Sequence, residues 1–162
     1  MTRTIKIPVE LRGAGLHSGQ VVRLRIKPEL DGRGIRFVRT DLPGAPAISS
    51  RDIDTQGAPF RTALRNGNAE VQTVEHLLSA LAGLGVTDCE IEIDGLEVPG
   101  LDGSALSFTD AIQRAGIVEL GRAVCPLAIT ERIAIQDGPA SIEALPFKGS
   151  PIPLGWLKLD VR

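Results

Sequence analysis

Hydrophobic and polar residues alternate along several short segments of the first half of the chain. Over residues 21–27, aliphatic residues alternate with basic ones, the two-residue period of a strand with one buried face. Aliphatic runs over 5–11 and 34–39 predict two further strands, and a second alternating run at 90–94 predicts another. The segment 40–59, which contains three prolines, is expected to be a loop.

The hydrophobic period changes after residue 72. Valine and leucines at positions 74, 77, 78 and 81 recur at the spacing of one helix face. Thr73 is the expected N-cap of this helix, and Gly83 and Gly85 are expected to end it. A second helix is predicted over 104–115.

A hairpin is predicted just before the first helix, because Asn66-Gly67 lies between the runs 60–64 and 69–71. The resulting order is strands, helix, strand, helix. This order favours an α+β domain, in which two helices pack on one sheet.

The chain leaves this unit near residue 122, so a first α+β domain is expected over residues 1–122. Residues 123–162 are expected to be the opening strands of an incomplete second domain. Strands are predicted over 129–135 and 142–144, on either side of Asp137-Gly138, and over 157–161. Few strands without a helix bury little surface, and we therefore expect the natural chain to continue past Arg162.

Composition and charge exclude several classes of protein. The formal net charge is −2 and the charged residues are interspersed, which argues against a nucleic-acid-binding surface. No segment approaches the length of a membrane span or the apolar core of a signal peptide. Cys89 and Cys125 are far apart in the sequence, which indicates reduced thiols rather than a disulfide framework. A soluble, cytoplasmic protein is expected.

The two histidines of the chain, His17 and His76, have different surroundings. On a helical wheel starting at Val74, His76 lies at about 200°, away from the leucines. Ala80 and Gly83 fall on the same side, so a helix between two layers is expected, with small residues beside the histidine. The pair formed by His76 and its neighbour Glu75 has two interpretations: a solvated helix start or a functional pair.

Spacing alone defines no metal site, because a catalytic zinc needs three protein ligands. His17 lies in the glycine-rich turn 13–19 and is a second ligand candidate or an ordinary turn residue. That turn lacks the Lys-Ser/Thr pair of a phosphate-binding loop. Ser104 is interpreted as part of a capped helix start rather than as a nucleophile, since no histidine follows it in the sequence.

Three motifs together carry a resemblance to a known family, and Arg39-Thr40-Asp41-Leu42 fits it as well. They are Gly13-Ala14-Gly15-Leu16-His17-Ser18-Gly19, then Thr73-Val74-Glu75-His76-Leu77-Leu78-Ser79-Ala80-Leu81-Ala82-Gly83-Leu84-Gly85, then Glu97-Val98-Pro99-Gly100-Leu101-Asp102-Gly103-Ser104-Ala105. In order and spacing they resemble the UDP-3-O-acyl-N-acetylglucosamine deacetylases of lipid A biosynthesis in Gram-negative bacteria. The similarity covers essentially the whole chain, but only about the first half of a family member.

The resemblance implies a fold, a cofactor and residue roles. It implies two α/β domains with their helices sandwiched between two sheets, and zinc-dependent hydrolysis of an acetamide on a UDP-linked acylated amino sugar. His76 would be a zinc ligand and Glu75 the general base. Leu16 and His17 would lie near the active-site cleft, and the stretch that begins with Phe60 and Arg61 would line it.

Some features of the family have no counterpart here. The ligands of its second domain, a His and an Asp, are absent from the chain, and Ala140 and Val161 replace residues that lie near the nucleotide. The missing half would be supplied by the same polypeptide or by a second chain. We expect residues 1–162 alone to be inactive. The competing hypothesis is a non-catalytic first domain that acts as a binding or subunit module.

Overall fold

The structure is a computed structural model, and it describes residues 1–54, 60–124 and 128–146. The chain forms two compact units, residues 1–123 and 124–162. Within the described residues, no helix is long and apolar enough to cross a membrane.

A five-stranded mixed sheet organises the first unit. Its strand order is β2-β3-β8-β4-β5, and all neighbours are antiparallel except β4 and β8. The strands are β2 (Val9–Ala14), β3 (Val21–Pro28), β8 (Cys89–Ile93), β4 (Ile35–Arg39) and β5 (Ala47–Ser49). Their side chains alternate between a buried and a more exposed face, as the period of two predicts for β3 and β8.

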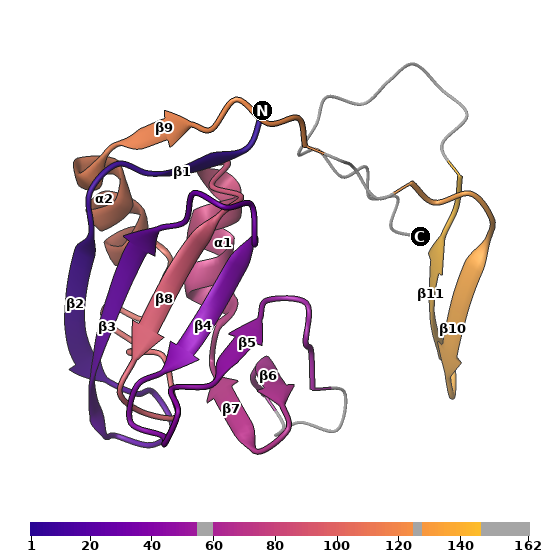
Figure 1. Cartoon of the computed structure of the whole chain (residues 1–162). Helices are drawn as coiled ribbons and strands as arrows, with labels where there is room; N and C mark the ends of the chain where they lie inside the picture. Colours follow the sequence, from indigo (N-terminus) through magenta and orange to yellow (C-terminus); the bar gives the residue numbers. More distant parts are fainter. Residues whose placement is uncertain (55–59, 125–127, 147–162) are drawn as a thin grey trace. The chain divides into compact units, whose positions relative to one another are not determined.

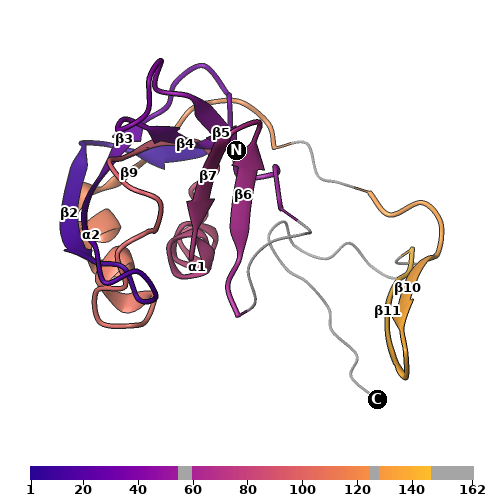
Figure 2. The ribbon, with the colours of Figure 1, turned by 90° about the horizontal axis from the view of Figure 1, so that it is seen from below.

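Two helices, α1 (Glu75–Gly83) and α2 (Leu106–Ala115), cover one face of this sheet (Figures 1 and 2). The core between the layers is aliphatic, with Phe37 and Phe108 as its largest fully buried side chains. The predicted α+β class, with two helices on one sheet, is confirmed.

The predicted hairpin is also present. Strands β6 (Ala63–Asn66) and β7 (Ala69–Gln72) pair antiparallel around a turn with Gly67 at φ 57°. Figure 2 shows α1 between this hairpin and α2. The hairpin therefore flanks the helix that carries the Glu-His pair.

Arg39 fastens the hairpin to the end of β4. Its guanidinium donates to both carboxylate oxygens of Asp41, at 2.8 and 2.7 Å, and to the backbone carbonyl of Glu70 in β7. The bonds from Arg39 lower the pKa of Asp41 despite its partial burial. The Arg39–Asp41 pair is thus a structural link between sheet and hairpin.

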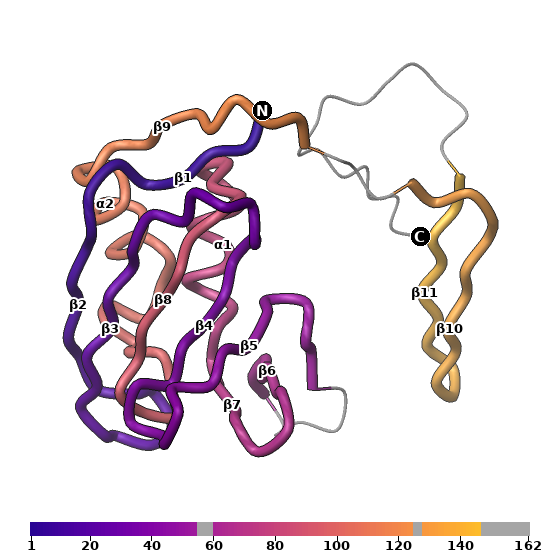
Figure 3. The backbone as a smooth tube through the Cα atoms, viewed as in Figure 1, coloured from indigo at the N-terminus to yellow at the C-terminus, as the bar shows by residue number. Residues whose placement is uncertain are grey.

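Two strand predictions were wrong in detail. The single strand expected over 5–11 is divided into β1 (Arg3–Ile5) and β2, with Pro8, which has no N–H to donate, before β2. Strand β1 instead pairs with β9 (Ile117–Glu119), which runs beside it in Figure 3. The segment expected to be a loop contains β5, which forms its ladder with β4.

The predicted N-cap was wrong as well. Helix α1 begins at Glu75 with Val74 as its N-cap residue, and no side chain caps it. Thr73 has φ 57°, and its hydroxyl donates to Glu97 instead. The Thr73 hydroxyl, which was predicted to cap α1, therefore bonds to the carboxylate of Glu97, a residue distant in the sequence.

The described part of the second unit contains one hairpin, β10 (Ile133–Asp137) with β11 (Ala140–Ala144), around Asp137-Gly138. Its residues are largely exposed, in contrast to the buried strands of the first unit. The first of these strands begins at residue 133 rather than at 129 as predicted. The strand predicted over 157–161 lies outside the described residues, as does Val161, while Ala140 begins β11.

Candidate active site

Glu75 and His76 form the first residues of α1, and both side chains are half-buried. The exposed side of the helix continues with small residues, Ser79, Ala82 and Gly83. A Cβ added at Gly83 would meet no atom within 4 Å, so this side of the helix is open.

One residue predicted on this open side lies elsewhere. Ala80 is only 3% exposed and belongs to the core together with Leu77 and Leu81. Because α2 packs beside α1, the buried face of α1 extends beyond the row of leucines from which that face was predicted. The prediction for Ala80 was wrong, and that for Gly83 is confirmed.

The segment before the hairpin contacts the Glu75 carboxylate directly. The backbone N–H of Thr62 donates to Glu75 Oε2 at 3.2 Å. Phe60, two residues earlier, is 95% exposed and has φ 65°. Arg61 between them is half-buried, and its Nε has no hydrogen-bond partner among the described residues. The predicted substrate-binding residues Phe60 and Arg61 therefore directly precede, in the chain, a residue that contacts Glu75.

The glycine-rich turn connects β2 to β3. It closes through backbone bonds from Gly15 N–H to the Gln20 carbonyl at 2.9 Å and from Gly19 N–H to the Gly15 carbonyl at 3.0 Å. Leu16 is 61% exposed and His17 is also exposed. The side chains of these two predicted residues thus face solvent, whereas the backbone of the turn faces inward.

Glu97, the first residue of the third motif, holds this turn in place, a role that the sequence did not indicate. This carboxylate is 2% exposed and lies next to three donors. Oε1 accepts from His17 N–H at 2.9 Å and from the Thr73 hydroxyl at 3.0 Å, and Oε2 accepts from Ser18 N–H at 2.8 Å. Burial alone would raise the pKa of Glu97, but the bonds from Ser18, His17 and Thr73 outweigh it and lower the pKa to about 2. The carboxylate is therefore ionised at neutral pH.

Backbone pairing brings Glu97 to this position. Residues 72 and 97 form a parallel bridge, with Gln72 N–H donating to the Leu96 carbonyl at 2.9 Å and Val98 N–H to the Gln72 carbonyl at 3.0 Å. Gly15 makes room for the carboxylate, since a Cβ there would lie 2.3 Å from Glu97 Oε2. Gly15 and Glu97 belong to two of the family motifs, but no local pattern indicated that their side chain and backbone meet.

The residues present supply only part of a metal site. The His76 imidazole is a suitable zinc ligand by its chemistry. Within residues 1–54, 60–124 and 128–146, however, no group of three or more His, Cys, Asp or Glu side chains could hold a metal ion. Cys89 is buried, which raises the pKa of its thiol to about 12 and keeps it protonated.

Ser104 behaves as the sequence predicted. Its hydroxyl donates to Asp102 at 2.8 Å and accepts the backbone N–H of Leu106, the first residue of α2, at 3.0 Å. These bonds close the turn before α2, as expected, but the helix begins at Leu106 rather than at residue 104, and its N-cap residue, Ala105, makes no side-chain cap bond.

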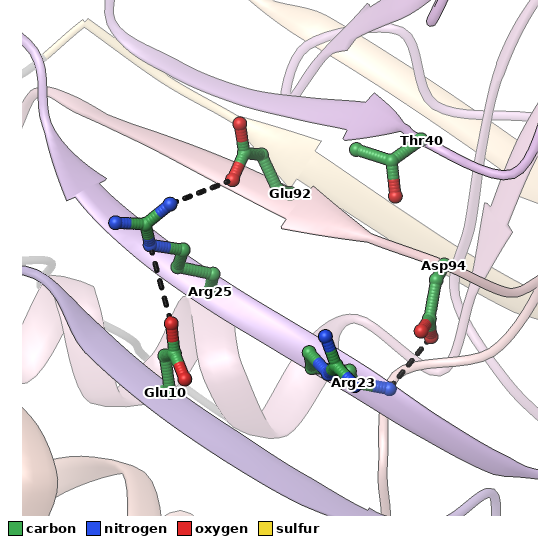
Figure 4. A pocket seen from close by; sticks show the side chains of 6 residues that line it. All are labelled: Glu10, Arg23, Arg25, Thr40, Glu92 and Asp94. Atoms are coloured by element: carbon green, nitrogen blue, oxygen red, sulfur yellow. Dashed lines mark hydrogen bonds and ion pairs between the residues drawn. The ribbon is translucent and has the colours of Figure 1, made fainter.

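A polar hollow of about 200 Å³ lies on the other face of the sheet, away from the helices (Figure 4). Glu10, Arg23, Arg25, Thr40, Glu92 and Asp94 line it. Arg25 pairs with Glu10 at 3.5 Å and with Glu92 at 3.8 Å, so these charges satisfy one another across neighbouring strands. The hollow is a charged outer surface of the sheet.

Comparisons with known proteins identify the class to which this fold and site belong. The family model of the UDP-3-O-acyl N-acetylglycosamine deacetylases (LpxC) matches residues 2–156. Proteins named UDP-3-O-acyl-N-acetylglucosamine deacetylase from Shewanella halifaxensis and Shewanella pealeana are each 43% identical to the chain over 148 residues. The one from Pseudomonas entomophila is 40% identical over 147 residues.

Each of these alignments covers 91% of the chain and 48% of the relative. The chain belongs to the UDP-3-O-acyl N-acetylglycosamine deacetylase family, and the resemblance carried by its motifs is confirmed. It spans about half the length of the curated relatives it matches.

Proposed function

We propose that the protein containing this chain hydrolyses the acetamide of a UDP-3-O-acyl-N-acetylglucosamine, a step of lipid A biosynthesis in Gram-negative bacteria, in the cytoplasm. The observation that carries the proposal is the Glu75-His76 pair on the open side of α1, in a chain that belongs to this family. The reaction adds water across the C–N bond and releases acetate and a free 2-amino sugar.

In this proposal, Glu75 is the general base and His76 is a zinc ligand. A bound zinc ion supplies Lewis-acid polarisation of the amide carbonyl. Glu75 takes a proton from the attacking water and returns it to the leaving amine, which balances the reaction. The Thr62 N–H donates to Glu75 Oε2, and in this proposal Oε1 faces the reacting water.

We further propose that Leu16, His17, Phe60 and Arg61 contact the substrate. Both segments are tied to the start of α1, one through Glu97 and Thr73 and the other through Thr62 and Glu75. Exposed Leu16 and Phe60 offer apolar surface, and His17 and Arg61 offer polar groups.

The remaining zinc ligands belong, in this proposal, to a second domain that covers the open side of α1. The small residues Ser79, Ala82 and Gly83 would allow its close approach. Residues 123–162 would be its first strands, and the rest would follow in the same polypeptide or come from a second chain. This arrangement fits the share of the curated relatives that the chain spans.

The test uses the complete natural polypeptide, assayed for acetate release from UDP-3-O-acyl-N-acetylglucosamine. Glu75→Ala should keep its bound zinc and lose turnover by about 100-fold or more, the usual contribution of a general base. His76→Ala should lose both zinc and turnover. Glu10→Ala, which removes an exposed carboxylate on the outer face of the sheet, is the matched control and should change neither.

The zinc content and the turnover of these variants distinguish a metal ligand from a general base. Loss of zinc in Glu75→Ala would show that Glu75 is a ligand rather than the base. Absence of acetate release by the wild-type protein with zinc present would overturn the enzymatic proposal and favour the binding-module hypothesis.

A further inference from the structure

Glu97 joins two segments that the proposed function uses separately. On one side its carboxylate holds the backbone of His17 and Ser18, and on the other it holds the hydroxyl of Thr73, two residues before Glu75. The carboxylate is buried, so it cannot itself be a solvent-facing catalytic group. The side chain of Ser18 adds a further hydrogen bond to this carboxylate.

Thr73 stands in a backbone conformation that its side chain disfavours. Its φ of 57° is in the left-handed region, where a β-branched residue is a true outlier. Such a conformation persists only when surrounding contacts impose it, and it is typical of functional sites. Here the hydroxyl donates to Glu97 and the backbone N–H donates to the Thr62 carbonyl at 2.9 Å.

These contacts form a continuous hydrogen-bonded path to the proposed base. It runs from Glu97 to Thr73, from Thr73 to the Thr62 carbonyl, and from the Thr62 N–H to Glu75. The direction in which the chain enters α1 is set at Thr73, immediately before the helix. The helix start and the Thr62 donor therefore share one anchor, Thr73.

We propose that Glu97 and Thr73 are positioning residues, which fix the start of α1, and with it Glu75, relative to the turn that carries His17. This inference rests on the proposed function, since the activity it tunes is the deacetylation described above. In this role, the Glu97 carboxylate and the Thr73 hydroxyl hold the proposed base, Glu75, at a fixed position relative to the turn that contacts the substrate.

Two substitutions at Thr73 separate positioning from packing. Thr73→Val keeps the shape and the β-branching but has no hydroxyl, whereas Thr73→Ser keeps the hydroxyl. In the complete natural polypeptide, Thr73→Val should lower kcat by about tenfold or more, with zinc content and KM little changed, because small displacements of a catalytic group are costly. Thr73→Ser should retain kcat within about threefold, because the bond to Glu97 survives.

Glu97→Gln is the matching change on the acceptor side. Glutamine keeps the size of glutamate but has one acceptor oxygen, and its amide NH₂ would face an N–H donor of the turn. It should reproduce the kcat loss of Thr73→Val. A folded Thr73→Val protein with wild-type kcat, at a temperature well below unfolding, would overturn the proposal and leave Glu97 a purely structural residue.

A second readout does not depend on activity. In the 162-residue chain, amide NMR signals of Ser18 and Thr62 report the two ends of the path. Thr73→Val should shift both signals and Thr73→Ser should leave both near their wild-type positions. A Thr73→Val spectrum with either signal unmoved would overturn the coupling, whether or not the wild-type enzyme proves to be a deacetylase.

Discussion

The outer face of the sheet and the corner around Glu97 carry charge in different ways. On the outer face, Lys27 lies 2.7 Å from Glu90 and 2.6 Å from Glu92, and Arg36 lies 2.7 Å from Glu90. All these side chains remain partly exposed. At the corner a single carboxylate is 2% exposed and has three donors from two distant segments.

The number of charges in a region is a poor guide to how strongly that region constrains the fold of this protein. The outer face has more charged groups, but its cations and anions are matched across neighbouring strands. They raise the pKa of Lys27 and lower that of Glu90, mainly through their mutual hydrogen bonds. Exposed pairs of this kind contribute little to stability. A buried carboxylate is costly unless its bonds are complete, so the single charge at the corner constrains the structure more.

The largest expected difference between the two regions is in how acid changes the free energy of unfolding. The folded-state pKa of Glu97 is about 2, below its usual value of 4.5, so the folded state binds fewer protons than the unfolded state in this range. Its contribution to the free energy of unfolding is therefore complete above pH 4.5 and is lost as pH falls toward 2. The full contribution is about 3 kcal/mol, at about 1.4 kcal/mol per pKa unit.

The measurement is urea unfolding, followed by circular dichroism between pH 6 and pH 2.5, for wild type and Glu97→Gln. The wild-type curve should fall more steeply with acid, and the difference between the two proteins should shrink at low pH. Parallel curves would contradict the strong ionisation of Glu97.

Adding a side-chain atom at the Glu97 corner should have the next largest effect on the free energy of unfolding. Gly15→Ala places a Cβ 2.3 Å from Glu97 Oε2 and 2.5 Å from Ser18 Oγ, atoms that cannot both retreat without breaking bonds. We expect a loss of about 2 kcal/mol in the free energy of unfolding, within the usual cost of overpacking. Gly83→Ala is the control, because open space surrounds that position. Equal stability of the two variants would contradict the close approach of Glu97 to the turn.

Substitutions on the outer face of the sheet should change the free energy of unfolding least. Glu92→Gln removes the ion pairs to Lys27 at 2.6 Å and Arg25 at 3.8 Å, and it should cost less than about 1 kcal/mol, as exposed pairs do. This loss should shrink further in about 1 M NaCl, where screening is strong. A salt-independent loss as large as that of Gly15→Ala would show that the two regions do not differ as described.

Several elements could be predicted because their signal is local. The alternation over 21–27 and 90–94, the Asn66-Gly67 turn and the leucine spacing of α1 each lie within one segment, and the structure contains the corresponding elements. Strand β5 had no such signal, since Ala47–Ser49 is short and is defined by its ladder with β4. Ala80 was misplaced because the wheel could not indicate where α2 would pack.

In the candidate site, too, some features could be predicted from local sequence and others could not. Glu75 and His76 are adjacent in the chain, so the sequence by itself determined that they occur together at the start of a helix, and its motifs determined the family. Only the tertiary structure decided what surrounds them. Residues 17, 73 and 97 are far apart in the sequence, and their contact depends on the pairing of Gln72 with Glu97 and on the space left at Gly15. Thr73 was expected to cap α1 because local propensity favours that bond, but a buried carboxylate needs its donors more than a helix end open to water does.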